Sequence, residues 1–345
     1  MSAPLKSMPY VRLGKSGLKI SKIILGCMTY GAPDSGIPWA LGEEEATAHI
    51  KAAYDAGINT FDTANMYSNG LSEIILGKAI KQLNLPRDEI VIMTKAFFPV
   101  GHEVSAQRTD TTEANGYANQ SGLSRKHIFE SVKHSLDRLQ LDYVDVFQCH
   151  RFDPNTPIEE TMHALHDIVQ AGYTRYIGMS SCYAWQFQLM QNYALANNLT
   201  PFISMQNCYS MLYREEEREM MPTLEHFGVG SIPWSPLARG LLTRPWTAPK
   251  TLRQETDLWL AVLAQGDADK STVDRLEEVA NRIGASMAQT ALAWVMAQSA
   301  VSAPIVGTTS VANLHDLLGA ISITLSAEDV KYLGEPYTPK AIYGH

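Results

Sequence analysis

The chain has 345 residues, of which 45% are hydrophobic, and a formal net charge of −8. This length and composition predict a folded chain, one domain over residues 1–345, and argue against disorder. The acidic balance argues against nucleic acid and anionic membrane surfaces as partners, because both require a basic face. The chain also shows no signal peptide and no apolar run of about 20 residues. Its four cysteines form no C-x-x-C pair. These features favour a reduced, cytoplasmic protein.

A series of short apolar runs organises the chain. Before the first of them, residues 10–21 predict a hairpin that turns at Lys15–Gly17. The runs are continuous rather than alternating, which is typical of strands buried on both faces. They are Ile23–Cys27, Ile58–Asp62, Ile90–Lys95, Tyr143–His150, Thr174–Ser180, Phe202–Gln206, Val229–Ser235 and Ala303–Gly307.

Longer amphipathic stretches separate these runs and predict helices. They are Glu43–Ala56, Leu71–Leu83, Ser124–Leu139, Pro157–Ala171, Ala184–Asn197, Glu215–Phe227, Ser310–Ala320, and a pair within Ser271–Gln298. Ser124 and Thr156 are predicted N-terminal caps, and Gly284 is expected to separate the pair. The charged run at 214–219 predicts an exposed helix start.

Eight strand-like runs that alternate with helices predict a parallel α/β domain, and the count favours a closed (β/α)8 TIM barrel. The hairpin would then plug the barrel floor. An open, doubly wound sheet is the alternative, because a sequence does not show closure. Two connections, Phe97–Leu123 and Arg244–Gln265, are too long for simple turns. Both follow strands, so we expect them at the C-terminal face, where barrel enzymes place the active site.

Polar residues stand at the C-terminal ends of most predicted strands. They are Asp62, Lys95, His150, Ser180, Gln206 and Ser235, and Gly307 ends the eighth run. A purely structural barrel does not need a ring of polar groups at one mouth, so the ring indicates an active site.

The most specific element is the segment from Asp62 to Tyr67, followed by Ser72 and Glu73. A free tyrosine is a poor acid at neutral pH. A nearby ammonium from Lys95 would make its phenol more acidic, and Asp62 would hold that cation in place. His150 could orient a substrate oxygen or join the proton relay. The sequence therefore predicts acid–base chemistry by these four residues.

The same segments resemble the aldo-keto reductase family, most closely its aryl-alcohol dehydrogenase-like and versiconal hemiacetal acetate reductase-like members. FDTANMYSNGLSE is similar to the family signature, and MTK and FQCHRFD match the segments that bear its lysine and histidine. The resemblance implies the catalytic tetrad Asp62, Tyr67, Lys95 and His150.

The resemblance also implies a cofactor site along the later strands. GMSSCYAWQF, MQN and WSPLARGLL are similar to the segments for the nicotinamide and the pyrophosphate, and VGTTSVANLHDLLGA to the adenosine segment. The implied cofactor residues are Asp62, Ser180, Ser181, Gln206, Trp234, Ser235, Leu237, Arg239, Gly240, Gly307, Thr309, Ser310, Asn313 and Asp316. Ser181 is a mild departure, because the family often has asparagine there.

The implied reaction is carbonyl reduction by NADPH, with Tyr67 as proton donor and no metal. The G-x-G-x-x-G loop of a dinucleotide-binding sheet is absent from the sequence. One departure concerns the cofactor: residues 307–317 contain no Lys or Arg to pair with the 2′-phosphate, which keeps NADH as an alternative. Arg239 or a loop arginine could compensate.

Aromatic residues near strand ends predict a pocket for a flat, apolar carbonyl substrate. The candidates are Tyr30, Phe97, Phe152 and Trp246. Two other functions stay open. One is a cofactor-binding regulatory subunit like the potassium-channel β-subunits that resemble this family. The other is a lyase or isomerase that uses Lys95 as a Schiff base. The natural substrate, the direction and the oligomeric state are not given by the sequence.

Overall fold

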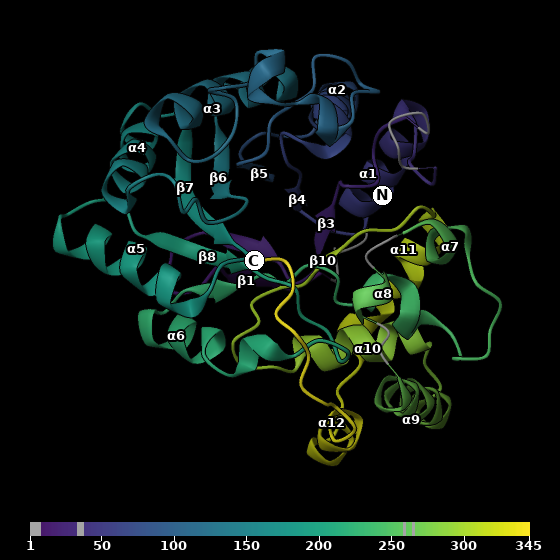
Figure 1. The fold of residues 1–345 in the computed structure, drawn as a ribbon. Coiled ribbons are helices and arrows are strands. Elements are labelled where there is room, and N and C mark those ends of the chain that lie inside the picture. The colour runs from purple at the N-terminus through teal and green to yellow at the C-terminus, as the bar shows by residue number, and fades with distance from the viewer. Residues whose placement is uncertain (1–7, 33–37, 258–259, 264–265) are drawn as a thin grey trace.

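Eight short parallel strands form the centre of the fold (Figure 1). The computed structural model describes residues 8–32, 38–257, 260–263 and 266–345. The strand order is β10-β3-β4-β5-β6-β7-β8-β9, so the strands from β3 to β9 pair in chain order. The strands are β3 (Ile24–Gly26), β4 (Thr60–Asp62), β5 (Val91–Ala96), β6 (Val144–Cys149), β7 (Thr174–Ser180), β8 (Phe202–Gln206), β9 (Gly230–Ser231) and β10 (Ile305–Val306).

The sheet closes on itself beside β9 and β10. The peptide nitrogen of Ile305 donates to the carbonyl of Pro233 at 2.9 Å, and that of Ser302 donates to Ser231 at 2.8 Å. These bonds join the last strand to the seventh strand of the barrel. The (β/α)8 barrel is therefore confirmed, and the doubly wound alternative is wrong.

Helices surround the strands, as Figure 1 shows. They are α1 (Glu43–Asp55), α2 (Leu71–Gln82), α3 (Arg125–Leu139), α4 (Ile158–Gln170), α5 (Ala184–Ala196), α6 (Met220–Phe227), α9 (Asp267–Ile283), α10 (Met287–Met296) and α11 (Val311–Leu318). Two short helices, α7 (Leu252–Thr256) and α8 (Leu260–Leu263), lie in the second long connection, and α12 (Ala327–Gly334) follows the barrel. Among the described residues, no helix is both long and apolar enough to cross a membrane.

Most predicted helix ends agree with the structure. Ser124 accepts a hydrogen bond from the peptide nitrogen of His127, which satisfies a free donor of the first turn of α3. Gly284, in the left-handed region at φ 69°, ends α9 and separates it from α10. The predicted cap at Thr156 is wrong by one residue, since Pro157 precedes α4.

The predicted helix over 215–227 is wrong at its start. Only a short 3-10 turn covers Glu215–Glu217, and α6 begins at Met220. The side chains of Glu215 and Glu216 are buried rather than exposed, because they accept hydrogen bonds from Tyr337 and Asn207. These partners hold the acidic run in a turn. The helical periodicity of the sequence gives no information about them.

The hairpin fills the floor of the barrel. Strands β1 (Tyr10–Arg12) and β2 (Lys19–Ser21) pair antiparallel. Leu13 and Ile20 are fully buried and cluster with inward residues of the barrel strands such as Met93, Val146 and Ile232. The predicted plug is confirmed, and it leaves the opposite end of the barrel as the open face for chemistry.

Candidate active site

Three neighbouring strands bring the predicted acid–base residues to one end of the barrel. Asp62 is the last residue of β4, Lys95 lies one residue before the end of β5, and His150 directly follows β6. The peptide nitrogen of His150 donates to the carbonyl of Ala96 at 3.0 Å, which continues the ladder with β5. Tyr67 begins the 3-10 turn that leads from β4 to α2. All four residues therefore gather at the C-terminal face.

The ammonium of Lys95 is the centre of this cluster. Its side chain is fully buried, and Nζ donates to Asp62 Oδ2 at 2.6 Å, to the carbonyl of Thr63 at 2.7 Å and to the Tyr67 hydroxyl at 3.3 Å. An ammonium has three N–H donors, so each one has a partner. Burial alone would lower the pKa of Lys95, but the charge and hydrogen-bond contributions of Asp62 and Tyr67 together outweigh burial, and the pKa is raised above its ordinary value. Lys95 is thus a fixed cation with one N–H aimed at the Tyr67 oxygen.

The carboxylate of Asp62 is held from both sides. Oδ2 accepts from Lys95, and Oδ1 accepts from Gln148 Nε2 at 3.0 Å and from Gln206 Nε2 at 2.9 Å. Gln206 Nε2 also donates to Gln148 Oε1 at 3.0 Å. Side chains from β4, β5, β6 and β8 therefore share one buried polar network. A fully bonded network of this kind fixes the position of every member.

Aromatic rings surround the open side of the cluster. The rings of Tyr67 and His150 meet edge to face with centroids 5.8 Å apart, and Phe98 meets His150 in the same manner at 5.3 Å. Phe97 contacts Phe98 at 5.0 Å. These rings make an apolar wall beside the Tyr67 hydroxyl, where a carbonyl oxygen could accept its proton.

The residues expected near a nicotinamide lie on β7, on β8 and just after β9, which is the seventh strand of the barrel. Ser180 Oγ donates to the carbonyl of Gln206 at 2.7 Å, and Trp234 Nε1 donates to Ser181 Oγ at 3.1 Å. Because the amide nitrogen of Gln206 is engaged with Asp62, only its oxygen is open to a carboxamide ligand. The ring of Tyr343 meets that of Trp234 at 5.8 Å, so a late segment of the chain covers part of the indole.

The segment that follows β9, residues 235–240, has a backbone suited to binding an anion. Ser235, Ala238 and Arg239 have φ between 46° and 56°, and Gly240 has φ 99°. Such left-handed residues turn successive peptide N–H groups toward one point, which is how backbone nests hold phosphates. A Cβ at Gly240 would meet nothing within 4 Å, so the backbone there borders open space. Leu237 lies in the same turn and packs against both large core clusters.

Arg239 adds positive charge to this turn. Its guanidinium pairs with Asp257 at the end of α7, and its buried Nε has no hydrogen-bond partner among the described residues. Asp257 is shared with Arg253 at 3.4 Å. Burial and the nearby Arg239 lower the pKa of Arg253. Two guanidinium groups therefore share one carboxylate, and the excess charge fits a dinucleotide pyrophosphate.

The segment expected to hold the adenosine follows β10 and continues onto α11. Gly307, Thr309 and Asn313 are exposed just past β10 and on the first turn of α11, and Ser310 accepts from the peptide nitrogen of Asn313 as its cap. Asp316 points elsewhere. Its two carboxylate oxygens accept from Ser286 Oγ at 2.7 Å and Gln289 Nε2 at 3.0 Å on α10. Asp316 therefore fixes α11 against α10, and its place in a cofactor site stays a prediction.

The aromatic residues predicted to line the substrate pocket lie in different surroundings. Tyr30 is fully buried, and its hydroxyl bonds His49 Nδ1 of α1 at 2.8 Å, so the prediction that it lines a pocket is wrong. Phe97 is half-buried in the wall described above. Phe152 is half-buried and lies near Trp185, with ring centroids 6.2 Å apart. Trp246 is half-buried and packs against the core cluster that includes Tyr209 and Trp294.

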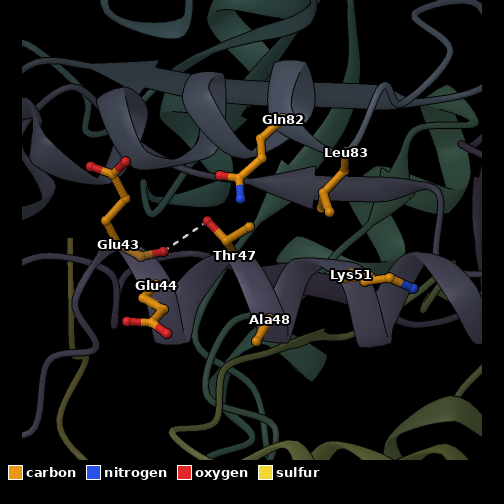
Figure 2. A pocket seen from close by; sticks show the side chains of 7 residues that line it. All are labelled: Glu43, Glu44, Thr47, Ala48, Lys51, Gln82 and Leu83. Carbon is orange, nitrogen blue, oxygen red and sulfur yellow. Dashed lines mark hydrogen bonds between the residues drawn. The ribbon is translucent and has the colours of Figure 1, made fainter.

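A separate surface groove lies outside this face. Figure 2 shows it between α1 and α2, with the Thr47 hydroxyl turned back to the carbonyl of Glu43 at 2.7 Å. Its volume is about 460 Å3, and its lining residues are Glu43, Glu44, Thr47, Ala48, Lys51, Gln82 and Leu83. None of these is a strand-end residue, so the groove is no part of the acid–base site.

Two residues of the site were not predicted. Gln148 holds Asp62, and Thr63 offers its carbonyl to Lys95. Gln148 had a signal, because it stands two residues before His150 on the same face of the strand. Thr63 acts through its backbone and has no signal in its side chain.

Comparison with known proteins agrees with this geometry. The aldo/keto reductase family model matches residues 22–337. The versiconal hemiacetal acetate reductase of Aspergillus parasiticus is 48% identical over 343 residues, which is 97% of this chain and 99% of that protein. A protein of Schizosaccharomyces pombe, named provisionally as an aryl-alcohol dehydrogenase, is 49% identical over 97% of both chains. An aldo-keto reductase of Fusarium vanettenii is 43% identical over 97% of this chain and 93% of its own. With this match along nearly its whole length, the chain belongs to the aldo/keto reductase family and is an oxidoreductase.

Proposed function

We propose that the chain reduces aldehyde or ketone carbonyls to alcohols with NADPH, and that Tyr67 donates the proton. The observation that carries the proposal is the buried ammonium of Lys95, held between the Asp62 carboxylate at 2.6 Å and the Tyr67 hydroxyl at 3.3 Å. A tyrosine at the mouth of a barrel gains an acid role from such a partner, which a surface tyrosine lacks.

The four acid–base residues would together transfer one proton from Tyr67 to the substrate oxygen. A carbonyl oxygen that enters beside His150 is within reach of the Tyr67 hydroxyl. As the carbonyl carbon is reduced, charge develops on this oxygen, and Tyr67 transfers its proton there. The Lys95 N–H that points at the Tyr67 oxygen then stabilises the phenolate that remains on Tyr67. Asp62 keeps the cation in place, and Gln148 and Gln206 keep Asp62 in place.

Bound NADPH would supply the hydride for this reduction. Ser180, Ser181 and the Gln206 oxygen would hold its carboxamide, and Trp234 would support the ring. The left-handed turn of Ser235–Gly240 with Arg239 would hold the pyrophosphate. Thr309 and Asn313, exposed beside β10, would face the adenosine end. We propose NADPH over NADH because the aldo/keto reductase family typically uses it, and Arg239 and Arg253, which share Asp257 beside this turn, are the arginines that could pair with the 2′-phosphate.

The apolar wall formed by Phe97 and Phe98 indicates the substrate class. Phe98 stands beside His150, Phe97 packs against Phe98, and both rings are half-buried. An aromatic or otherwise apolar carbonyl compound would bury its flat part against them. Aromatic aldehydes are therefore the substrates that we propose first.

The two other functions have less support. A Schiff base requires a neutral amine, but Lys95 is fully buried, its pKa is raised, and its three N–H groups are engaged. The regulatory-subunit alternative is not favoured, because the relatives are named for reductase or dehydrogenase activity.

The test measures loss of reduced-nicotinamide absorbance with NADPH or NADH and a panel of aromatic and aliphatic aldehydes. We expect wild type to turn over an aromatic aldehyde, with kcat/KM higher for NADPH. Tyr67→Phe should lose at least about 100-fold in kcat while its Kd for NADPH, from fluorescence titration, stays within about threefold. Tight cofactor binding without turnover of any carbonyl would contradict the reductase and support a binding subunit.

A further inference from the structure

The turn that carries Tyr67 has an unusual backbone. Ser68 and Asn69 have φ of 47° and 49°, and Gly70 follows with φ 90°. Left-handed backbone is strained for a residue with a side chain, so two such residues in succession need support from elsewhere in the fold. Asn69 can adopt this conformation because asparagine tolerates the left-handed region better than most residues, and its side-chain amide supplies the hydrogen bonds that hold it there.

The Asn69 amide binds a distant loop at four points. Oδ1 accepts from the peptide nitrogen of Gly101 at 3.0 Å. Nδ2 donates to the carbonyls of Ala106 at 2.9 Å, Val104 at 3.0 Å and Glu103 at 3.3 Å. An amide has two N–H groups, so one of them is shared between two carbonyls. One side chain thus closes residues 101–106 into a compact loop beside the Tyr67 turn.

Gly101 shows that the fit is close. A Cβ there would lie 2.6 Å from the Cβ of Ala106 and 3.1 Å from Asn69 Oδ1. Glycine is therefore required by packing at the point where the loop meets the amide. The contact is specific from both sides.

The same loop begins with the aromatic wall of the site. Phe97 and Phe98 precede Gly101, and Asn65 Nδ2 donates to the carbonyl of Phe98 at 3.2 Å. Two asparagines that flank Tyr67 therefore attach this loop, Asn65 at its start and Asn69 at its middle. The wall that faces His150 and the proton donor are parts of one bonded unit.

From this arrangement we infer that Asn69 is a positioning residue that sets substrate selectivity. It holds the loop at 97–106 so that Phe97 and Phe98 stand at a fixed distance from Tyr67, and this favours carbonyl compounds with a flat apolar group over small aliphatic ones. The inference rests on the proposed carbonyl reduction and adds the residue that determines its substrate class.

The test compares two variants with one control. Asn69→Gly keeps the left-handed backbone and deletes all four side-chain bonds. Gly101→Ala leaves Asn69 and its turn unchanged and disturbs the contact from the loop side. The control is Asn84→Gly, since Asn84 is also left-handed at φ 49° but is exposed after α2. For each protein, kcat/KM is measured for benzaldehyde and for propanal, and the Kd for NADPH by fluorescence.

We expect the benzaldehyde-to-propanal ratio of kcat/KM to fall at least tenfold in Asn69→Gly, mainly through KM for benzaldehyde. Gly101→Ala should lower the ratio in the same direction, and Asn84→Gly should leave it unchanged. The Kd for NADPH should stay within about threefold in all three. Equal losses for both aldehydes, or an unchanged ratio, would overturn the inference.

Hydrogen exchange separates this inference from the proposed function. The Gly101 amide should exchange at least tenfold faster in Asn69→Gly, because its acceptor is lost, and at the wild-type rate in Asn84→Gly. If wild type reduces no aldehyde, the proposed function fails and the selectivity claim fails with it. If wild type is active but the Gly101 amide is equally protected in Asn69→Gly, only the inference about Asn69 fails.

Discussion

Removal of the Lys95 charge tests the ion pair at the centre of the site. The Lys95 and Asp62 side chains are 0% and 3% exposed, and their N–O distance is 2.6 Å. In Lys95→Met the Asp62 carboxylate would keep only the neutral amides of Gln148 and Gln206 as partners. Loss of one member of a buried pair costs about 3–5 kcal/mol, because it leaves a charge without compensation. We expect the free energy of unfolding to fall by about this amount, a large share of the roughly 5–15 kcal/mol typical of folded proteins.

A double variant isolates the cause of this loss. Asp62→Asn combined with Lys95→Met removes both charges, so it should recover about 2 kcal/mol or more of the stability lost in the single variant. Both proteins should be inactive, because Tyr67 has lost its cationic partner. The measurement is urea unfolding, with the midpoint and the slope m determined for each protein.

The matched control is an exposed pair of the same type. Lys51 and Asp55 form an ion pair on α1 with side chains 59% and 56% exposed. Lys51→Met should change the free energy of unfolding by about 0.5 kcal/mol or less. The reasoning is refuted if Lys95→Met unfolds at the wild-type midpoint, or if the double variant is no more stable than the single one.

Two further predictions concern the packing around the site. Burial lowers the pKa of His49 to about 4, against about 6.5 in the unfolded chain, so between these pH values the unfolded state binds more protons and stability rises with pH. Between pH 7 and pH 4 this residue should remove up to about 3 kcal/mol, and urea midpoints of His49→Gln should fall less steeply with acid than those of wild type; parallel curves would contradict the assignment. At Gly77 of α2, a Cβ would lie 2.3 Å from the carbonyl oxygen of Leu139, so Gly77→Ala should lower the free energy of unfolding by about 1–3 kcal/mol although alanine favours helices. Gly17→Ala, whose Cβ would meet nothing within 4 Å, should be neutral, and equal thermal midpoints for the two variants would count against the packing argument.

The strands and the helices could be predicted because their signals are local. All eight apolar runs contain a strand, and seven of them end within one residue of the observed strand end; the exception is the run 229–235, because β9 ends at Ser231. Burial on both faces gives continuous apolar runs, and such runs are distinctive in an α/β chain. The acidic run at 214–219 failed for the opposite reason. Its conformation depends on Tyr337, which is 122 residues away from Glu215, and on Asn207, which lies outside the predicted helix.

The acid–base residues could be predicted because barrel topology converts sequence position into spatial position. A polar residue at the end of a parallel strand must lie at one face, wherever it stands in the chain. Side-chain direction does not follow from that rule. Tyr30 follows β3 and Asp316 lies on α11 after β10, yet the Tyr30 hydroxyl bonds His49 and Asp316 bonds α10. Position near the mouth predicted their neighbourhood and not the side to which they point.

The division between strands and loops has a consequence for substrate choice. The charges that would support the proposed proton transfer belong to Asp62 and Lys95, which lie on paired strands and are held further by Gln148 and Gln206. The wall that meets the substrate belongs to a loop that asparagine side chains attach to the Tyr67 turn. Because the two parts have separate supports, substitutions in the loop can alter which carbonyl compound fits while the proton-transfer network stays intact. The same barrel mouth can thereby serve different substrates at little cost in stability, provided that the Asn69 contact or an equivalent one keeps the wall in place.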